Sequence, residues 1–505
     1  MISEPHFPVF EVKMQVEKDY YAILGLSEAA TAQEIKKAYR RLARRYHPDA
    51  DTDEEDVAHF REIQEAYDVL GDPDQREAYD RWREIEGLDQ KPALILRATP
   101  SYQTLAYLGE EQAFYVLLEI MPTSEIKGKR PPLNLCLVLD RSTSMQGERL
   151  QKAKDAASYI IDRLSEDDIF SLVVFSDKAE TVLSGRQRPN KALAKSVVST
   201  IGSWGGTEIL QGLLAGLSEG EKCRLPNSIN HLILLTDGQT YGDEEGCLEQ
   251  AEIARQRQIS ITTLGLGADW NDELLDQIAA RSGGTSAYID SPTKIMEVFR
   301  DKIHSLRSVL ARELVLTLRL GKEAKLREVF RVSPYITRIE EQGGVFPLGM
   351  LESHKGDVFL VDMLVSPQSV GQHRLVRVEA VGDIPVLARQ KERAWQEIIV
   401  NFTEEPIPDQ QVPSAIVGAL GKLAIFRMQE KALIELGRGE TDLATQRLET
   451  MATRLINIGE IELARAALLE AGRIAKTGQL SPEGRKKIKY GTRSLSILPR
   501  EVRHD

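Results

Sequence analysis

Short apolar segments alternate with amphipathic stretches between residues 133 and 303 of this chain. The segment LNLCLVLD at 133–140 has the length and composition of a buried parallel strand, and 148–164 has the period of an amphipathic helix. The pattern then repeats, predicting strands at 168–176, 231–237, 259–267 and 286–290 and helices at 207–217, 244–258, 271–283 and 292–303. Such alternation predicts an α/β domain with a doubly wound, Rossmann-like parallel sheet.

Length and charge limit what surrounds this domain. A chain of 505 residues is too long for one core and predicts about three or four domains. Its 77 acidic and 65 basic residues give a net charge of −12, which argues against nucleic acid as the main partner. We expect a cytoplasmic protein without a membrane span, because no apolar run has transmembrane length and the first residues lack a signal-peptide pattern. Cys136, Cys223 and Cys247 show no CxxC spacing, so neither a disulfide framework nor a zinc site is expected.

Oxygen-bearing side chains follow the predicted strands at the edge where such sheets bind ligands. Asp140, Ser142 and Ser144 lie in the DRSTS loop after the first strand, Thr207 lies at a helix start, and Asp237 ends a later strand. Each residue alone could be a helix N-cap, but the capping explanation weakens considerably for five of them at three successive strand ends. Two carboxylates and three hydroxyls suit Mg²⁺ or Mn²⁺ better than zinc.

This pattern resembles the metal-ion-dependent adhesion site (MIDAS) of von Willebrand factor type A (VWA) domains. All five positions of its DxSxS…T…D signature are present, although residue 143 is Thr where Gly is commoner. The resemblance implies that the serines and threonine coordinate the ion directly and that the aspartates do so directly or through water. It also implies that an acidic residue of a protein ligand completes the metal shell. Because no nucleophile or base stands beside these residues, we expect no enzymatic activity.

The N-terminal region has the pattern of a helical hairpin. Ile35, Tyr39, Leu42 and Tyr46 share one helix face, with a capping box at the helix start, and 56–72 predicts a second helix. Two basic rows run along the first helix: Lys36, Arg40 and Arg44, and beside them Lys37, Arg41 and Arg45. The tripeptide His47, Pro48 and Asp49 follows in the loop. From charge alone, the basic rows could simply be a solvated helix face.

The segments DYYAILGL, HPD and FREIQEAYDVLGDPDQREAYDRW, with the basic helix between them, resemble a complete J-domain of DnaJ-like cochaperones. The resemblance implies an all-α domain that docks on an acidic surface of a DnaK-type chaperone and stimulates its ATPase. By motif position, His47, Pro48 and Asp49 form the stimulating loop, and the six cations of the two basic rows are the docking charges. No Gly/Phe-rich segment or cysteine-rich repeat follows, so client choice is expected to come from the rest of the chain.

Alternating strand patterns flank the α/β domain, and helices follow. Strands are predicted at 93–100, 113–120, 312–320, 327–334, 356–367 and 371–381. Neither set alone is large enough for a core, so we expect one β-sandwich in which the α/β domain is inserted. Residues from 412 onward predict a C-terminal α-helical bundle. The expected boundaries are 18–84 for the J-domain, 92–126 and 305–402 for the two parts of the sandwich, 130–304 for the VWA domain and 410–498 for the helical domain.

Two functions agree with these features. The first is a cochaperone whose VWA domain binds a specific protein and whose J-domain recruits a DnaK-type chaperone to it. The second is a metal-dependent scaffold or adaptor of an ATPase assembly, as some bacterial VWA proteins are, with a secondary J-domain. The intact HPD tripeptide favours the first.

Overall fold

The computed structural model describes residues 20–26, 30–45, 54–86, 92–123, 128, 130–188, 190–225, 227–353, 355–405, 407 and 410–495. The chain divides into two compact units, Met1–Lys91 and Pro92–Asp505, and each is considered by itself.

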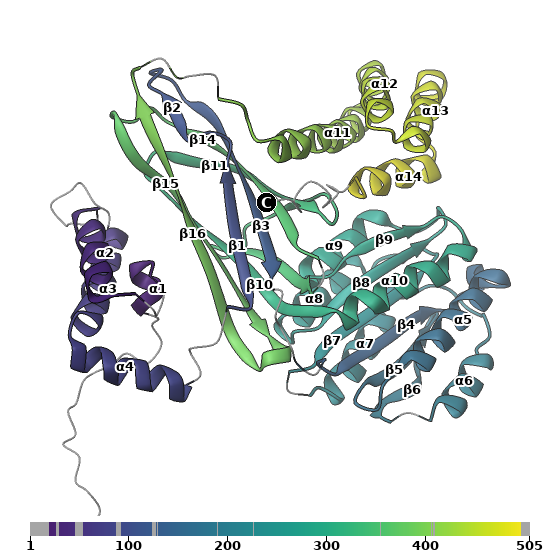
Figure 1. The fold of residues 1–505 in the computed structure, drawn as a ribbon. Coiled ribbons are helices and arrows are strands. Elements are labelled where there is room, and N and C mark those ends of the chain that lie inside the picture. The colour runs from purple at the N-terminus through teal and green to yellow at the C-terminus, as the bar shows by residue number, and fades with distance from the viewer. Residues whose placement is uncertain are drawn as a thin grey trace, which may run out of the picture. The chain divides into compact units, whose positions relative to one another are not determined.

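The first unit is helical, as the sequence predicts (Figure 1). Its helices are α1 (Tyr20–Leu24), α2 (Ala32–Arg45), α3 (Glu54–Leu70) and α4 (Pro73–Glu86). The backbone N–H of Thr31 donates to the Glu34 carboxylate at 2.7 Å, and the Glu34 N–H donates to the Thr31 hydroxyl at 3.3 Å. These reciprocal bonds confirm the predicted capping box and satisfy two donors that a helix start otherwise leaves open.

The α2–α3 hairpin packs through the predicted apolar faces. Ile35 and Ile63 are fully buried, and the rings of Tyr39 and Tyr67 stack with centroids 4.0 Å apart. Helices α1 and α4, which the apolar periodicity did not identify as separate elements, complete this core: the backbone N–H of Tyr20 donates to the buried Tyr79 hydroxyl at 2.9 Å. Helix α1 is too short, at five residues, to show a helical period.

The second unit contains a six-stranded sheet in the order β6-β5-β4-β7-β8-β9, with helices on both faces (Figure 1). The strands are β4 (Leu133–Asp140), β5 (Ile169–Phe175), β6 (Ala179–Gln187), β7 (Ile229–Thr236), β8 (Ser260–Leu266) and β9 (Ser286–Ile289). The helices are α5 (Glu148–Arg163), α6 (Lys191–Ser199), α7 (Ile209–Lys222), α8 (Glu244–Gln256), α9 (Asp272–Ser282) and α10 (Ile295–Arg307).

Alternate residues of β4 enter two different cores, because successive side chains point to opposite faces of a sheet. Leu135, Leu137 and Leu139 pack with α5, α6 and α10, whereas Cys136 and Val138 pack with α7, α8 and α9. A strand covered by helices on both faces is therefore apolar throughout, which is why LNLCLVLD has no polar alternation.

One strand departs from the predicted all-parallel sheet. Strand β6 pairs antiparallel with β5, from Phe175 opposite Ala179 to Ile169 opposite Gln187. Only a short turn separates the two strands, and a parallel partner would need a crossover of a dozen or more residues. The sequence reading missed both β6 and α6, since β6 lies at the edge of the sheet and most of its residues are partly or fully exposed.

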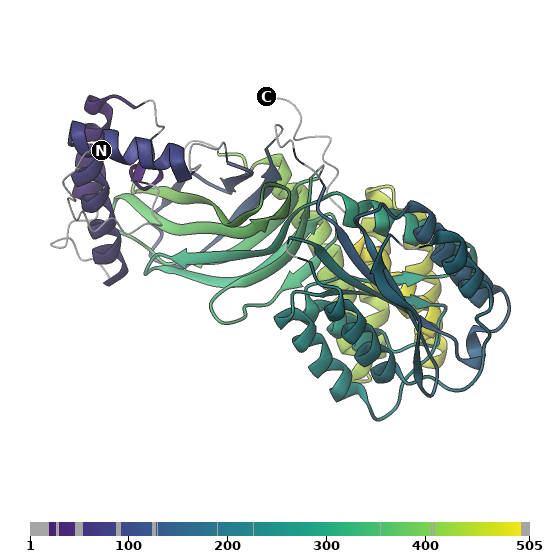
Figure 2. The same ribbon diagram turned by 90° about the horizontal axis from the view of Figure 1, so that it is seen from below.

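The remaining strands form two five-stranded sheets, in the orders β1-β3-β14-β11-β12 and β13-β10-β15-β16-β2. Their bounds are β1 (Leu94–Pro100), β2 (Thr104–Ala106), β3 (Gln112–Pro122), β10 (Val309–Leu320), β11 (Ala324–Ser333), β12 (Thr337–Ile339), β13 (Phe346–Glu352), β14 (Asp357–Val365), β15 (Gly371–Ile384) and β16 (Arg389–Thr403). Strands from before and after the α/β domain pair directly: β3 with β14 and β2 with β16. Side chains from both sheets, among them Phe114, Phe359, Val378 and Phe402, share one buried core, and Figure 2 shows the two sheets as separate layers.

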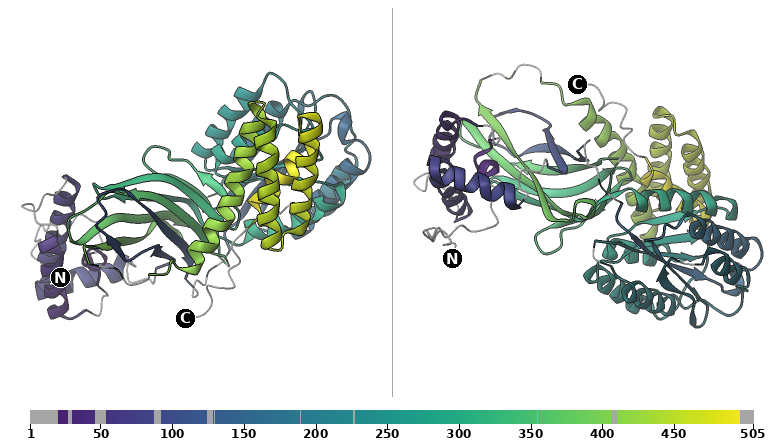
Figure 3. Two further views of the ribbon diagram at one scale, coloured as in Figure 1. Left: turned by 90° about the horizontal axis from the view of Figure 1, so that it is seen from above. Right: turned by 60° about the horizontal axis from the view of Figure 1, so that its bottom comes forward.

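Four C-terminal helices follow, α11 (Ser414–Gly437), α12 (Thr441–Asn457), α13 (Ile461–Thr477) and α14 (Pro482–Arg493). Figure 3 shows α11, α12 and α13 side by side next to the sheets. Helix α11 covers the β1-β3-β14-β11-β12 sheet, where Phe426 meets Phe330 edge to face with centroids 6.3 Å apart. Among the described residues, none of the helices has the length and apolar character needed to cross a membrane.

Helix α14 joins these helices to the α/β domain. Arg493 donates two hydrogen bonds, of 2.9 and 2.8 Å, to the carboxylate of Asp276 on α9, and Lys489 lies between Asp272 and Asp276. Lys486 donates to the backbone carbonyl oxygens of Ala268 and Trp270 in the loop after β8. The C-terminal helices therefore contact the sheets through α11 and the α/β domain through α14.

Candidate metal site and partner surfaces

Strand β4 brings Asp140 to the carboxyl edge of the six-stranded sheet. Asp140 is the last residue of β4 and is fully buried. Its Oδ1 accepts a hydrogen bond of 2.8 Å from the backbone N–H of Ser142, and its Oδ2 accepts one of 2.5 Å from the hydroxyl of Thr236. Two neighbouring strand ends therefore hold the carboxylate in one orientation.

Four of the five predicted ligands lie in one chain of hydrogen bonds. The Oγ atoms of Ser142 and Ser144 are 2.9 Å apart, and the Ser144 hydroxyl donates to Asp237 Oδ1 at 2.7 Å. Asp140 joins through the Ser142 backbone, and both aspartates are buried. Residues separated by almost a hundred positions thus converge because β4 and β7 are parallel neighbours.

Thr207 lies against the same edge. A Cβ atom built on Gly238, the residue after Asp237, would come within 2.8 Å of the Thr207 hydroxyl oxygen. Helix α7 begins at Ile209 with Glu208 as its N-cap, so Thr207 precedes the helix by two positions and is not the N-cap. The structure therefore brings this hydroxyl close to the Asp237 loop and removes the capping explanation for it.

Thr143, the residue that departs from the commoner Gly, connects two loops of the site. Its backbone N–H and its hydroxyl both donate to the carbonyl oxygen of Gly205, at 3.1 and 3.0 Å. Gly205 has a φ of +80°, which favours glycine, and the next residue, Gly206, donates its N–H to Asp177 at 2.8 Å. A glycine at 143 could not make the hydroxyl bond, so this substitution adds a link between the DRSTS loop and the Thr207 loop.

The electrostatics of the site favour a bound cation. Burial, helped by the nearby charge of Asp237, raises the pKa of Asp140 to about 6, although the hydrogen bonds from Ser142 and Thr236 oppose this rise. Two buried carboxylates at one edge repel each other, and a cation between them would relieve both the repulsion and the cost of burial.

The sequence reading did not identify Arg149 as part of this site. Arg149 lies in the first turn of α5, and its Nη1 forms an ion pair with Asp237 Oδ2 and lies 3.4 Å from the carbonyl oxygen of Ser144. Its Nη2 would lie 3.6 Å from a Cβ built on Gly267, so the guanidinium reaches the loop after β8. A basic residue one turn after the signature was the available signal, but its direction depends on the fold.

The donor set fits a hard divalent cation. Carboxylate and hydroxyl oxygens are the ligands of Mg²⁺ and Mn²⁺, and no His or Cys belongs to the set. The part of the chain that the structure describes contains no group of three or more His, Cys, Asp or Glu residues arranged to hold a metal ion. A site built from two carboxylates and three hydroxyls is of a different kind, and Asp140, Ser142, Ser144, Thr207 and Asp237 would hold the ion.

The predicted chaperone surface is only partly described. Lys36, Lys37, Arg40 and Arg41 are exposed on α2. Arg44 and Arg45 belong to the same helix, but their side chains lie outside the described part of the chain. His47, Pro48 and Asp49 also lie outside the described residues.

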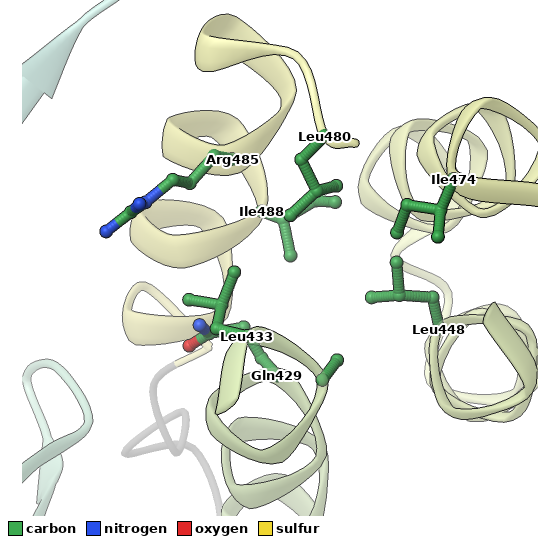
Figure 4. A pocket seen from close by; sticks show the side chains of 8 residues that line it. Gln429, Leu433, Leu448, Ile474, Leu480, Arg485 and Ile488 are labelled. Atoms are coloured by element: carbon green, nitrogen blue, oxygen red, sulfur yellow. The ribbon is translucent and has the colours of Figure 1, made fainter. Parts of the chain in front are cut away.

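A small pocket among the C-terminal helices has the character of a packed core. Figure 4 shows Leu448, Ile474, Leu480 and Ile488 pointing toward one another. Arg485 points away from them and pairs with Glu273 of α9 at 2.7 Å. The lining therefore offers apolar contacts and no cluster of catalytic groups.

Known families match three parts of this chain. Family models match at residues 19–80 (DnaJ domain), 134–301 (von Willebrand factor type A domain) and 414–497 (Sll0103-like, C-terminal alpha-helical domain). The protein sll0103 of Synechocystis is 32% identical over 382 residues, which cover 74% of this chain and 90% of sll0103. The DnaJ chaperone of Hydrogenobacter thermophilus is 61% identical over 64 residues, 13% of this chain and 18% of that protein. The chain thus spans about a fifth of the length of that DnaJ relative.

Among solved structures, a von Willebrand factor type A protein from Catenulispora acidiphila matches with a TM-score of 0.66 at 19% identity. The match covers 81% of this chain and 98% of that chain, which supports the fold. The fold and the family models together define a J-domain protein that carries a VWA domain. The chain belongs to the family of the Synechocystis protein sll0103.

Proposed function

We propose that this protein is a J-domain cochaperone that binds a specific protein partner through a metal ion in its VWA domain. The observation that carries the proposal is the hydrogen-bonded chain of Asp140, Ser142, Ser144 and Asp237 at one sheet edge. It occurs in a chain that also has a J-domain with an intact HPD tripeptide.

In this proposal Asp140, Ser142, Ser144, Thr207 and Asp237 hold Mg²⁺ or Mn²⁺. The bound ion supplies an electrophilic centre for a carboxylate oxygen of the partner. The five side chains would hold the ion, and the Thr143 hydroxyl links the DRSTS loop to the Thr207 loop. Only two formal charges come from the protein, which leaves the ion able to accept a third carboxylate.

The J-domain supplies the second half of the function. We assign residues 18–84 to it, with Lys36, Lys37, Arg40, Arg41, Arg44 and Arg45 as docking charges and His47, Pro48 and Asp49 as the loop that stimulates a DnaK-type ATPase. The four exposed cations of α2 support docking on an acidic surface. The partner held by the VWA domain would then be delivered to the recruited chaperone.

The rest of the chain supports these two sites. We interpret the two sheets, residues 92–126 and 305–402, as one β-sandwich into which the VWA domain, 130–304, is inserted. Residues 410–498 form the helical domain that braces both. The pairing of β3 with β14 and of β2 with β16 supports this division.

The proposal is tested by partner capture from a host lysate. Wild type is expected to retain a protein in Mg²⁺ that is lost with a chelator and with Asp140→Ala. Asp269→Ala, which removes an exposed carboxylate from the neighbouring loop, is the matched control and should capture as wild type does. Capture that depends on neither metal nor Asp140 would overturn metal-dependent binding. A captured ATPase assembly, with no stimulation of DnaK, would favour the scaffold function instead.

A further inference from the structure

Two exposed aromatic side chains flank the metal site. Trp204 is 48% exposed and lies three residues before the predicted ligand Thr207. Tyr241 is 79% exposed and lies four residues after the predicted ligand Asp237. Both rings belong to loops that carry predicted ligands, so they place exposed apolar area beside the candidate metal site.

Trp204 is held in place by the first loop of the site. Its backbone N–H donates to the carbonyl oxygen of Arg141 at 2.9 Å, and the Arg141 guanidinium lies 4.8 Å from its ring centroid. Arg141 is itself paired with Glu180 at 2.9 Å. The indole is therefore ordered on one side while about half of it remains open to solvent, so a partner could cover it with little loss of conformational entropy.

Tyr241 lies in the loop after β7, four residues after Asp237. The hydroxyl of Thr240 accepts from the Ile209 N–H at 3.3 Å, and Asp243 accepts from the Leu210 N–H at 3.0 Å. These bonds tie the Tyr241 loop to the start of α7, directly after Thr207. The loop is fixed although the ring projects into solvent.

The order of groups along the edge follows the order of the strands. The Trp204 loop bonds to the residues after β4 and β5, the ligands lie after β4 and β7, and Tyr241 follows β7. Neighbouring strands are about 4.8 Å apart, so an extended segment of a few residues could reach both rings while its central side chain meets the ion.

We propose that Trp204 and Tyr241 form two apolar subsites that select a partner segment in which an Asp or Glu is flanked by apolar side chains. This inference rests on the proposed function of the metal site. Trp and Tyr are the residues that most often dominate binding energy at interfaces, since each adds a large apolar area with few rotatable bonds. The Tyr and Trp rings supply apolar contact, and the metal with Arg149 supplies the attraction for the carboxylate.

Synthetic peptides test the proposal. The fluorescein-labelled peptides Leu-Phe-Asp-Leu-Phe, Ser-Gly-Asp-Gly-Ser and Leu-Phe-Asn-Leu-Phe are titrated with the full chain in Mg²⁺ and in chelator, with fluorescence anisotropy as the readout. The apolar Asp peptide is expected to bind about tenfold more tightly than the Gly/Ser peptide, and only in Mg²⁺. The Asn peptide should lose this binding.

Variants assign the effect to the two rings. Trp204→Ala and Tyr241→Ala are each expected to weaken the apolar Asp peptide about fivefold to tenfold and to leave the Gly/Ser peptide unchanged. Tyr107→Ala is the matched control, because Tyr107 is also 48% exposed but follows β2 in the sheets. Calorimetric Mg²⁺ affinity should be unchanged in all three variants. Trp204→Phe keeps a ring and should bind more tightly than Trp204→Ala.

The two proposals fail in different ways. Equal Mg²⁺-dependent binding of both Asp peptides, or unchanged binding in both aromatic variants, would overturn the subsites and leave the metal site standing. If neither Asp peptide shows Mg²⁺-dependent binding, metal-dependent recognition is overturned and the subsites with it. If Trp204→Ala also disturbs Mg²⁺ binding, the decision rests on Tyr241→Ala, whose side chain bonds to Gln239 and not to the ligands.

Discussion

The residues of the candidate metal site show how burial and charge act together. Asp140 and Asp237 are both buried, yet their surroundings differ: Asp140 accepts hydrogen bonds from neutral groups, while Asp237 pairs with the Arg149 guanidinium. A buried ion pair limits the attraction that Asp237 offers to a second cation. Arg149 is therefore the residue that we expect to set how tightly the site holds metal.

Replacing Arg149 with Met is expected to tighten Mg²⁺ binding about tenfold. The substitution removes a positive charge that pairs with Asp237, one of the residues that would hold the ion, and like charges a few ångströms apart repel by roughly 1–4 kcal/mol depending on exposure. Isothermal titration calorimetry measures the affinity. Arg149→Lys keeps the charge and is the control, for which we expect a smaller change. Weaker binding in Arg149→Met would contradict this reasoning and show that Arg149 instead orients Asp237 for the metal.

At the scale of elements, helix α14 contacts α9 through several ion pairs. Lys489 and Arg493 of α14 face Asp272 and Asp276 of α9, and most of these side chains are largely buried. Burial raises the pKa of Asp276, but the charges and hydrogen bonds of Arg493 and Lys489 outweigh it and hold this pKa at about 2. The carboxylate therefore strengthens the docking of α14.

Asp276→Asn is expected to loosen α14 from α9. Removing one partner of a buried pair leaves the cations uncompensated, at a cost of roughly 3 kcal/mol. Hydrogen exchange at neutral pH should show about a hundredfold loss of protection in α14, because 1.4 kcal/mol corresponds to a factor of ten. Glu462→Gln, on an exposed face of α13, is the control and should exchange as wild type does. Unchanged protection in Asp276→Asn would mean that apolar packing alone holds α14.

The low pKa of Asp276 predicts that the docking of α14 on α9 depends on pH. The pKa of this carboxyl group is near 3.9 in an unfolded chain and about 2 in the folded protein, so its contribution is fully present above pH 4. The contribution, about 2–3 kcal/mol, is lost as the pH falls from 4 to 2. Protection of α14 in wild type should decline over this range, whereas Asp276→Asn should show a flatter profile. A wild-type profile as flat as that of the variant would contradict the low pKa.

The elements also differ in how well their sequences predict them. Helices α2, α3, α11, α12, α13 and α14 and the buried strands of the α/β domain follow from periodicity and capping residues, which are local signals. Strands β12, β13 and β16 were missed, as were β2 and β6. Strand β16 has a charged first half with mixed exposure, so its alternation is weak. Edge and short strands depend on the partner strand for their formation, and that partner is distant in sequence.

At the scale of the whole molecule, the chain consists of two compact units with one proposed site in each. A substitution in one unit should therefore remove the activity proposed for that unit and leave the activity of the other unchanged. The J-domain of the first unit is expected to act on the chaperone, and the VWA domain of the second is expected to act on the partner.

His47→Gln is expected to abolish stimulation of a DnaK-type ATPase and to leave Mg²⁺-dependent partner capture unchanged. Asp140→Ala is expected to abolish Mg²⁺-dependent partner capture and to leave ATPase stimulation unchanged, because the two sites lie in separate units. Steady-state ATP hydrolysis by DnaK and pull-down in Mg²⁺ are the two readouts, and each variant serves as the control for the other. Full stimulation by His47→Gln would refute the cochaperone function. Loss of stimulation in Asp140→Ala without partner present would show that the units are coupled.

The sequence by itself predicted the long helices and buried strands, the position of the J-domain and the five oxygen-bearing residues of the candidate metal site. These follow from local patterns: apolar period, capping residues and motifs within single loops. The tertiary structure decided which distant elements meet, such as β3 with β14, Arg149 with Asp237 and α14 with α9. The physical reason is that such contacts arise from the packing of complete elements, and neither the side-chain direction of Arg149 nor the surface that α14 covers is encoded in the residues next to them.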